Sequence, residues 1–307
     1  MYVADVCMYR YWTDDQANQQ RFPLFVSVDG TYQPTLLMAT GLRFSANIQV
    51  IQNVREATAC DGAADGYCWL SHHYRMLLQL FFECLKAPHL IFIEEDLAVA
   101  PDFFNYFAAV APLMDQDSSI LCVSAWNDHG QAGRASNNTA LLRTDIMPGL
   151  GWMLSASLGL EALPGWPGAG WDEYLRDQRF VKGRQCIFPE VARTHTFGEK
   201  GASGGIGYKE HLANMVLNKQ PVDWAKQVWR QLGPSMHASD VLPCMQHASL
   251  HSRSMLPAYG QLWYVQVLIE HVSAWPAVAC GLGPCCRHDN IEQMSCMQHA
   301  AQHVGQL

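Results

Sequence analysis

Three consecutive acids are the residues of this sequence best suited to chemistry. Glu94, Glu95 and Asp96 directly follow residues 90–93 (LIFI), a run typical of a buried strand. Carboxylates this close repel one another and raise one another's pKa, and a bound divalent cation offsets this repulsion. Oxygen ligands of this kind suit Mg²⁺ or Mn²⁺. A solvated acidic turn that caps the next helix is the alternative interpretation.

Three further features could contribute to a binding site. Asp29 ends a predicted strand, where acids contact nucleotides in α/β folds or form turns. His73 lies beside the apolar stripe of a predicted helix, a position that is more often structural. Residues 197–207 (FGEKGASGGIG) contain five glycines. Such a segment can cradle a phosphate or close over a site, and it can equally be a linker.

Alternating strands and helices position these residues. The hydrophobic pattern predicts strands at 22–28, 48–54, 90–93, 119–126 and 184–191, and helices at 35–46, 69–85, 102–113, 155–164 and from 171. This alternation, which continues to residue 212, predicts an α/β fold with a mixed sheet. Ligands of open α/β sheets bind beyond the carboxyl ends of the strands, where the three acids lie.

Composition limits the possible partners and compartments. The chain has 307 residues, 49% of them hydrophobic, and a formal net charge of −8. The charge gives no indication of nucleic-acid binding. Eleven cysteines and the sequon Asn137-Asn138-Thr139 permit a secretory compartment. Residues 1–20 contain no signal peptide, and polar residues interrupt the apolar stretch 262–282, so we expect no membrane anchor in this sequence.

Three regions follow from these patterns. Residues 1–21 form a divergent lead-in, 22–225 the main domain, and 226–307 a divergent region that we expect to be poorly packed. Residues 236–307 hold seven of the thirteen histidines and five of the eleven cysteines. The spacing of Cys296, His299 and His303 would also suit zinc, but an irregular tail is the favoured interpretation.

Seven blocks, in order and with matching spacing, resemble glycosyltransferase family 13. They are FPLFVSVDG (22–30), SHHYRMLLQLFF (71–82), EEDLAVAPDFFNYF (94–107), LCVSAWNDHG (121–130), LLRTDIMPGLGWML (141–154), WDEYLR (171–176) and GRQCIFPEVARTHTFGEKGASGG (183–205). The resemblance covers residues 22–212, and a weaker similarity continues to Trp224. It implies a GT-A glycosyltransferase fold, in which a Rossmann-like mixed sheet is flanked by helices. The family's first strand, which carries an arginine that contacts the nucleotide, has no clear counterpart and is expected to be missing.

The resemblance also implies an activity. Family members are Mn²⁺-dependent enzymes of the Golgi lumen that transfer GlcNAc from UDP-GlcNAc to a terminal α-mannose, in β-1,2 linkage and with inversion. Residues 144–152 and 197–203 favour a glycoprotein N-glycan as acceptor. Glu95, which replaces an aspartate, favours the branch that acts on protein O-linked mannose. A non-catalytic relic that binds sugar nucleotide or glycan is a third alternative.

The family's roles carry over to matching positions. For the donor, the resemblance implies that Asp96 ligates Mn²⁺, that Glu94 and Glu95 contact the donor sugar or ribose, and that Asp29 and His73 contact uridine. It implies that Leu150 lines the GlcNAc pocket and that Ser203 touches the diphosphate. It also implies that Asp172 is the catalytic base, with Trp171 beside it. It also implies a disulfide between Cys122 and Cys186.

Overall fold

The fold is described here from a computed structural model of the chain. The described residues are 11–46, 48–55, 60, 66–198, 208–209, 211–224 and 264–269, with only the backbone described at 38, 42–46 and 264–269.

An eight-stranded mixed sheet forms the centre of the fold, which confirms the predicted α/β class. Its strands are β1 (Leu24–Asp29), β2 (Gln49–Asn53), β3 (His89–Glu94), β5 (Ile120–Ser124), β6 (Leu141–Thr144), β7 (Trp152–Ser155), β8 (Gln185–Pro189) and β10 (Tyr264–Ile269), in the order β2-β1-β10-β3-β7-β5-β8-β6. Strands β2, β1, β10 and β3 are parallel to one another, and β7 runs antiparallel to both β3 and β5. Strand β8 is parallel to β5, and β6 is antiparallel to β8. The carboxyl ends of β1, β3, β5 and β8 therefore share one edge.

Strand β10 differs from what the sequence predicts. It lies between β1 and β3 and is parallel to both, with Val28 opposite Ile269 and Glu94 opposite Leu268. These six residues, within the region 226–307 that we expected to be poorly packed, therefore form a strand of the large sheet. The place between β1 and β3 is thus taken by a strand about 240 residues after β1 in the sequence. The possible zinc ligands at 296–303 lie outside the described residues.

A second sheet of two short strands lies beside the acids. Strand β4 (Leu97–Val99) pairs antiparallel with β9 (Thr194–Thr196). Three-residue strands are too short to show a period-2 pattern, so the sequence predicts neither. Because β4 begins directly after Asp96, this pairing brings β9 to the three acids.

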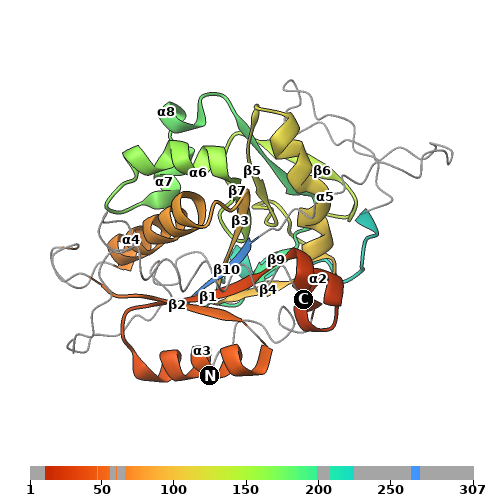
Figure 1. Cartoon of the computed structure of the whole chain (residues 1–307). Helices are drawn as coiled ribbons and strands as arrows, with labels where there is room; N and C mark the ends of the chain where they lie inside the picture. Colours follow the sequence, from red (N-terminus) through yellow and green to blue (C-terminus); the bar gives the residue numbers. More distant parts are fainter. Residues whose placement is uncertain are drawn as a thin grey trace. The chain divides into compact units, whose positions relative to one another are not determined.

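Helices cover both faces of the large sheet (Figure 1). They are α2 (Gln16–Arg21), α3 (Gln33–Ala46), α4 (Gly66–Leu78), α5 (Phe103–Gln116), α6 (Ala156–Ala162), α7 (Trp171–Arg176) and α8 (Gln178–Val181), with a π-helical continuation of α4 at Gln79–Cys84 and 3-10 turns at Leu163–Gly165 and Leu212–Asn214. Helix α3 lies on one side of β1 and β2, and α4 lies on the other (Figure 1). The predicted helices at 35–46, 69–85, 102–113, 155–164 and from 171 are confirmed.

Helix α4 packs through the stripe that its sequence predicts. The buried residues Leu70, Tyr74, Leu77, Leu78, Phe81 and Phe82 recur at helical spacing along α4 and its π-helical end. His73, next to this stripe, is buried as well. The same helix therefore packs the core and carries a candidate ligand.

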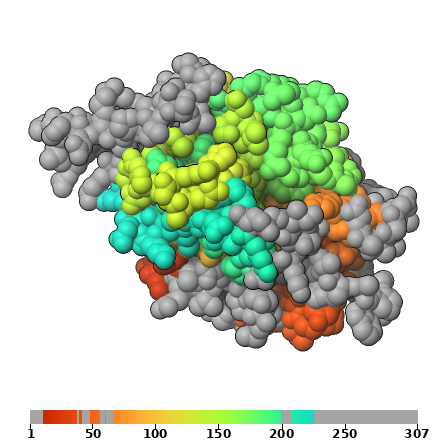
Figure 2. Space-filling view, turned by 180° about the vertical axis from the view of Figure 1, so that it is seen from behind, coloured from red at the N-terminus to blue at the C-terminus, as the bar shows by residue number. Residues whose placement is uncertain are grey.

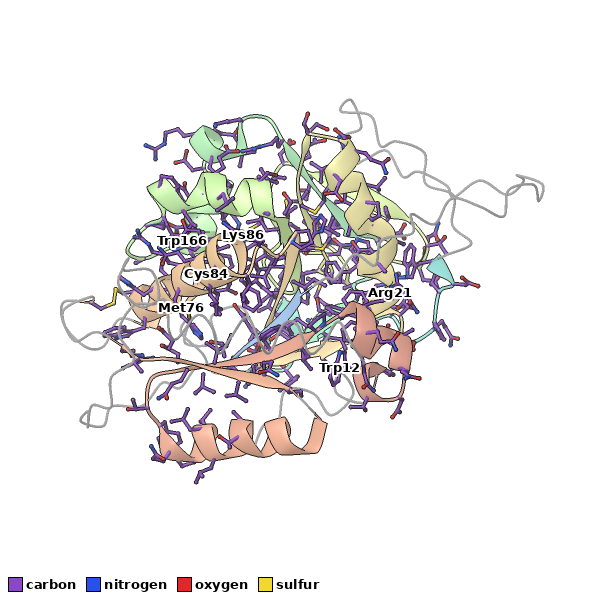
Figure 3. All side chains as sticks on the ribbon, viewed as in Figure 1. Trp12, Arg21, Met76, Cys84, Lys86 and Trp166 are labelled. Atoms are coloured by element: carbon purple, nitrogen blue, oxygen red, sulfur yellow. A yellow bond between two sulfur atoms is a disulfide. The ribbon has the colours of Figure 1, made fainter. Side chains whose placement is uncertain are left out.

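The lead-in also packs against the domain. The indole Nε1 of Trp12 donates a hydrogen bond to the carbonyl of Phe22 at 2.7 Å, and Asp15 caps α2 by accepting from the Ala17 amide. Trp12 and Arg21 are labelled in Figure 3 beside α2. Residues 11–21 are thus tied to the start of β1.

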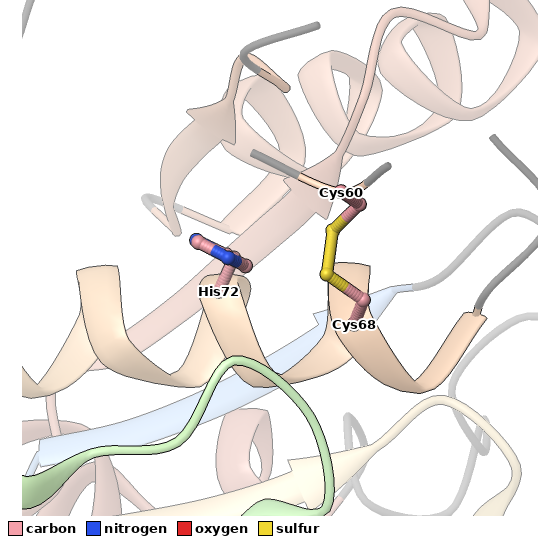
Figure 4. A group of neighbouring side chains, drawn as sticks. All are labelled: Cys60, Cys68 and His72. Atoms are coloured by element: carbon pink, nitrogen blue, oxygen red, sulfur yellow. A yellow bond between two sulfur atoms is a disulfide. The ribbon is translucent and has the colours of Figure 1, made fainter. Parts of the chain in front are cut away.

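Two disulfides occur among the described residues. Cys122 and Cys186 are bonded, as the resemblance implies, and join β5 to β8 with their Cα atoms 4.5 Å apart. Cys60 and Cys68 are also bonded, beside His72 on α4 (Figure 4). The sequence analysis does not predict this second bond. Within the described ranges, every helix is too short or too polar to cross a bilayer.

Candidate active site

The acidic turn, Glu94 to Asp96, lies at the carboxyl end of β3 and is partly buried. Burial raises the pKa of Glu94, and the charges of Asp96, Glu95 and Asp172 raise it further, against a hydrogen bond from Tyr74. Burial also raises the pKa of Asp96. Among the described residues, the charges that raise the pKa of Glu94 therefore all belong to other acids.

Asp96 has a carboxylate oxygen without a partner. Its Oδ1 is buried and accepts no hydrogen bond from the described residues. Its Oδ2 accepts a long hydrogen bond, 3.5 Å, from Thr196 Oγ1 of β9. A buried carboxylate oxygen left unpaired is costly unless a cation neutralises it. A hard divalent cation fits this donor set, because its preferred ligands are carboxylate oxygens.

The start of the glycine-rich segment lies against Asp96. The Phe197 amide donates to the Asp96 carbonyl at 2.9 Å, and the Gly198 amide donates to Thr196 Oγ1 at 3.3 Å. A Cβ atom at Gly198 would overlap Asp96 Oδ2. Glycine is therefore required here by the close approach of the backbone to the carboxylate. Ser203, further along the segment, lies outside the described residues.

Helix α7 brings Asp172 to the acidic turn. The helix begins after Gly170, whose φ of +67° suits glycine. Trp171 is buried and stacks on Tyr74 with ring centroids 4.2 Å apart. Tyr74 in turn donates from its hydroxyl to Glu94 Oε1 at 3.0 Å. These contacts, with the effect of Asp172 on the pKa of Glu94, show that Asp172 and the acidic turn belong to one cluster.

Arg176 holds the carboxylate of Asp172. Its Nη1 donates to Asp172 Oδ2 at 2.7 Å, and its Nε donates to the Met147 carbonyl at 3.0 Å. The sequence analysis does not identify Arg176. The signal was available, because an acid followed four residues later by an arginine pairs on one helix face.

Asp29 is fully buried at the end of β1 and is already paired. Its Oδ2 accepts from Arg55 Nη2 at 2.6 Å and from Arg55 Nε at 2.9 Å, and its Oδ1 accepts from Asn53 Nδ2 at 2.8 Å. The Arg55 guanidinium also stands 5.0 Å from the ring centroid of Trp69. Sequence reasoning missed Arg55, because nothing local links it to a residue 26 positions earlier.

His73 is buried on α4, and its ring contacts Ser27 of β1. Its Nε2 is 2.7 Å from Ser27 Oγ, and its Nδ1 is buried with no hydrogen bond to the described residues. Burial lowers the pKa of His73 to about 4, with Asp29 opposing and Arg55 reinforcing the shift. The imidazole is therefore neutral near pH 7 and can donate or accept one hydrogen bond at Nδ1. His73 directly precedes Tyr74, so α4 links Asp29 to Glu94.

Leu150 lies beside the strand that faces Asp96. Its carbonyl accepts from Thr194 Oγ1 of β9 at 2.6 Å. The next residue, Gly151, has a φ of +86°, and a Cβ there would press on Thr194. Close packing therefore fixes Leu150 between β9 and the start of β7.

The structure thus gathers most of the predicted site residues. Glu94, Glu95, Asp96, Trp171 and Asp172 form one group, and Leu150 packs on the strand beside Asp96. Asp29 and His73 lie at the neighbouring end of β1 and on α4. Tyr74, Arg55 and Arg176, none of them predicted, connect these positions.

The chain matches known proteins over most of its length. A model of the GNT-I family matches residues 4–256. An alpha-1,3-mannosyl-glycoprotein 2-beta-N-acetylglucosaminyltransferase from Arabidopsis thaliana is 40% identical over 204 residues, which are 66% of this chain and 46% of the relative. The match therefore spans about half the length of that curated relative.

Proposed function

The chain belongs to the GNT-I family, and on that premise we propose that it is a β-1,2-N-acetylglucosaminyltransferase. The donor is UDP-GlcNAc, the acceptor is a terminal α-mannose of a glycoprotein N-glycan, and the transferred sugar inverts its configuration. The fold is assigned to the GT-A class and the setting to the Golgi lumen. One observation carries the proposal: Glu94, Glu95 and Asp96 follow β3 at the carboxyl edge of the sheet, and Tyr74 links Glu94 to Trp171, the neighbour of Asp172.

The nucleotide half of the donor is assigned to the end of β1. Asp29 and His73 contact uridine, with Arg55 and Asn53 fixing the Asp29 carboxylate. The buried Nδ1 of His73, which forms no hydrogen bond to the described residues, supports this assignment, because a polar group there needs a partner. Glu94 and Glu95 contact the donor sugar or ribose, and Leu150 lines the GlcNAc pocket.

Asp96 is the residue proposed to hold Mn²⁺. When bound, the ion supplies positive charge that stabilises the departing diphosphate. The unpaired, buried Oδ1 of Asp96 and the concentration of acids around it support a cation at this position. Ser203 is proposed to add a hydrogen bond to the same diphosphate.

Asp172 is proposed as the general base. The mannose hydroxyl oxygen forms a bond to the anomeric carbon of GlcNAc, whose bond to the diphosphate oxygen breaks. The hydroxyl is barely acidic, so its proton must pass to a carboxylate as the new bond forms. Arg176 keeps that carboxylate in place, and the buried Trp171 precedes it in α7. The glycine-rich segment 197–207 is proposed to exclude water that would compete with mannose.

A transfer assay tests the proposal. The full chain is incubated with Mn²⁺, UDP-GlcNAc and an oligomannose N-glycan, and the product is analysed for a β-1,2-linked GlcNAc. Transfer that requires Mn²⁺ and is lost in Asp172→Asn supports the proposal. Hydrolysis of UDP-GlcNAc without transfer, or equal transfer by Asp172→Asn, contradicts it.

A second acceptor is favoured by one residue. Glu95 stands where an aspartate is usual in the branch that acts on N-glycans, and this points to protein O-linked mannose. A mannosyl peptide in the same assay separates the two acceptors. Binding of UDP with transfer to neither acceptor would favour a non-catalytic protein that retains the sugar-nucleotide site.

A further inference from the structure

We propose that Asn137 carries an N-linked glycan. Asn137-Asn138-Thr139 is the one acceptor sequon in the 307-residue sequence, and the proposed activity makes no use of it. The inference rests on the secretory setting that forms part of the proposed function, but not on its catalytic residues.

The geometry at Asn137 suits an attached sugar. Its Oδ1 accepts hydrogen bonds from the Thr139 amide at 3.0 Å and from Thr139 Oγ1 at 2.9 Å. The residue is partly exposed, and its Nδ2 donates no hydrogen bond to the described residues. Because a sugar bonds to Nδ2, its attachment would break none of these contacts.

Residues that come later in the sequence fix the backbone of this loop. Glu190 Oε1 accepts from the amides of Ser136 at 2.8 Å and Asn137 at 2.9 Å, and Arg193 donates to the Asn138 carbonyl. Glu190 and Arg193 lie more than 50 residues after the sequon. A glycan is therefore added to the extended chain, before these later residues pack, and the loop then closes around its base.

The loop lies at the same edge as the proposed site but away from it. It connects the carboxyl end of β5 to the start of β6, and β6 is four strands from β3 in the sheet. At ~4.8 Å per strand, that separation is roughly 20 Å. In Figure 2, the yellow-green segment that contains residues 131–145 lies on the surface. A glycan there can project into solvent without entering the acidic cluster.

The two disulfides support the required compartment. Cys60–Cys68 and Cys122–Cys186 are bonded, and such bonds persist in the oxidising secretory pathway. The same pathway supplies the sugar donor, an oligosaccharide carried on a lipid diphosphate. Nδ2 of Asn137 forms a bond to the anomeric carbon of that oligosaccharide and loses one proton, which passes to solvent. The bond from that carbon to the diphosphate oxygen breaks, and the lipid diphosphate leaves with the electron pair.

The test uses the full chain directed into the secretory pathway of eukaryotic cells by a cleavable signal. We expect one glycan per molecule, seen as a mobility shift that a peptide-N-glycosidase removes and as conversion of Asn137 to aspartate in the digested peptide. Asn137→Gln and Thr139→Ala should lose the shift, and Thr139→Ser should keep part of it. Asn138→Gln is the matched control, because it preserves the sequon and should remain glycosylated.

Two measurements guard against misfolding of the variants. An inhibitor of lipid-linked oligosaccharide synthesis should remove the shift from the unaltered sequence, and transfer by folded Asn137→Gln should equal that of the unaltered chain. An unmodified Asn137 in secreted chain overturns the inference, as does a shift that persists in Asn137→Gln. Either result leaves the proposed transferase activity untouched, and loss of that activity would leave glycan occupancy unchanged.

Discussion

Two aspartates at the same edge of the sheet have opposite surroundings. Asp29, at the end of β1, is fully buried, and both of its oxygens are paired, with Arg55 and Asn53. Asp96, just after β3, has one oxygen that accepts no hydrogen bond from the described residues, and other acids lie nearby. Arg55 pairs with the first carboxylate, whereas the described part of the chain shows no cationic side chain paired with the second. This difference separates a carboxylate that the protein itself pairs from one that is open to the proposed metal ion.

Asp96→Ala should have the largest effect. Metal-dependent UDP binding should be lost, because the variant removes the proposed metal ligand. Without metal the variant should be at least as stable as the unaltered chain, because the change relieves repulsion among the acids. Calorimetric titration with UDP and Mn²⁺ measures the first effect, and urea unfolding measures the second. Asp145→Ala, an exposed acid bonded to Gln185, is the control. Unchanged UDP affinity would move the metal site elsewhere.

Asp172→Asn should have the next largest effect. The amide keeps the shape but cannot take the mannose proton, and loss of a general base commonly costs ~10²–10⁴-fold in rate. UDP binding should be nearly unchanged. The Asp172 side chain pairs with Arg176 and does not cap α7, so little of the effect should come from lost helix stability. Turnover and melting temperature are measured together, with Glu173→Gln as control. Near-normal transfer by Asp172→Asn would refute the role.

Arg55→Met should lower stability, in contrast to Asp96→Ala. It leaves a buried carboxylate with only Asn53 as partner, so we expect a loss of about 3 kcal/mol in unfolding free energy and weaker UDP binding. Arg179→Met, which breaks the exposed pair with Asp177, should cause no measurable change. Urea unfolding of both variants compares them. If Arg55→Met and Asp96→Ala shift stability in the same direction, the contrast between the two aspartates fails.

His73 should give no effect near pH 7 and a limited one in acid, visible as a pH dependence. Its pKa in the folded chain is about 4, against 6.5 in the unfolded chain, so only the unfolded state binds its proton between these values. The contribution of His73 to the free energy of unfolding is therefore fully present above pH 6.5. It decreases as pH drops towards 4, by at most about 3 kcal/mol. Unfolding free energies from pH 7 to 4 should fall less steeply in His73→Gln. Equal slopes would mean that His73 titrates normally.

The residues that sequence analysis identified share one property, a local pattern. The strand at 90–93 and the stripe of α4 are periodic, and the acidic turn follows its strand directly. Assignment of Asp172, Leu150 and Ser203 needed the family resemblance, because each is unremarkable in its own segment. Arg55 and Tyr74 were missed because their partners, Asp29 and Glu94, lie 26 and 20 positions away. No periodicity encodes such pairs.

Strand β10 was missed for a related physical reason. Gln266 interrupts its apolar run, and the sequence around it shows no regular hydrophobic period. The hydrophobic pattern therefore does not predict a strand. Its backbone nevertheless pairs on both sides, with β1 and with β3. Whether a short mixed segment becomes a strand depends on the open hydrogen-bonding edges that it can meet, and these are set by distant parts of the chain.

The position of β10 also determines when this protein can fold. Val265 pairs with Leu24, about 240 residues earlier in the chain, so the centre of the sheet depends on its most distant contact. Contacts of such long range slow folding, because the intervening chain must be closed before they form. During synthesis, β1 and β3 emerge long before their shared neighbour and must wait with unpaired edges. In that interval the nascent chain is most vulnerable to aggregation, and we expect it to depend on chaperones until residue 269 has left the ribosome.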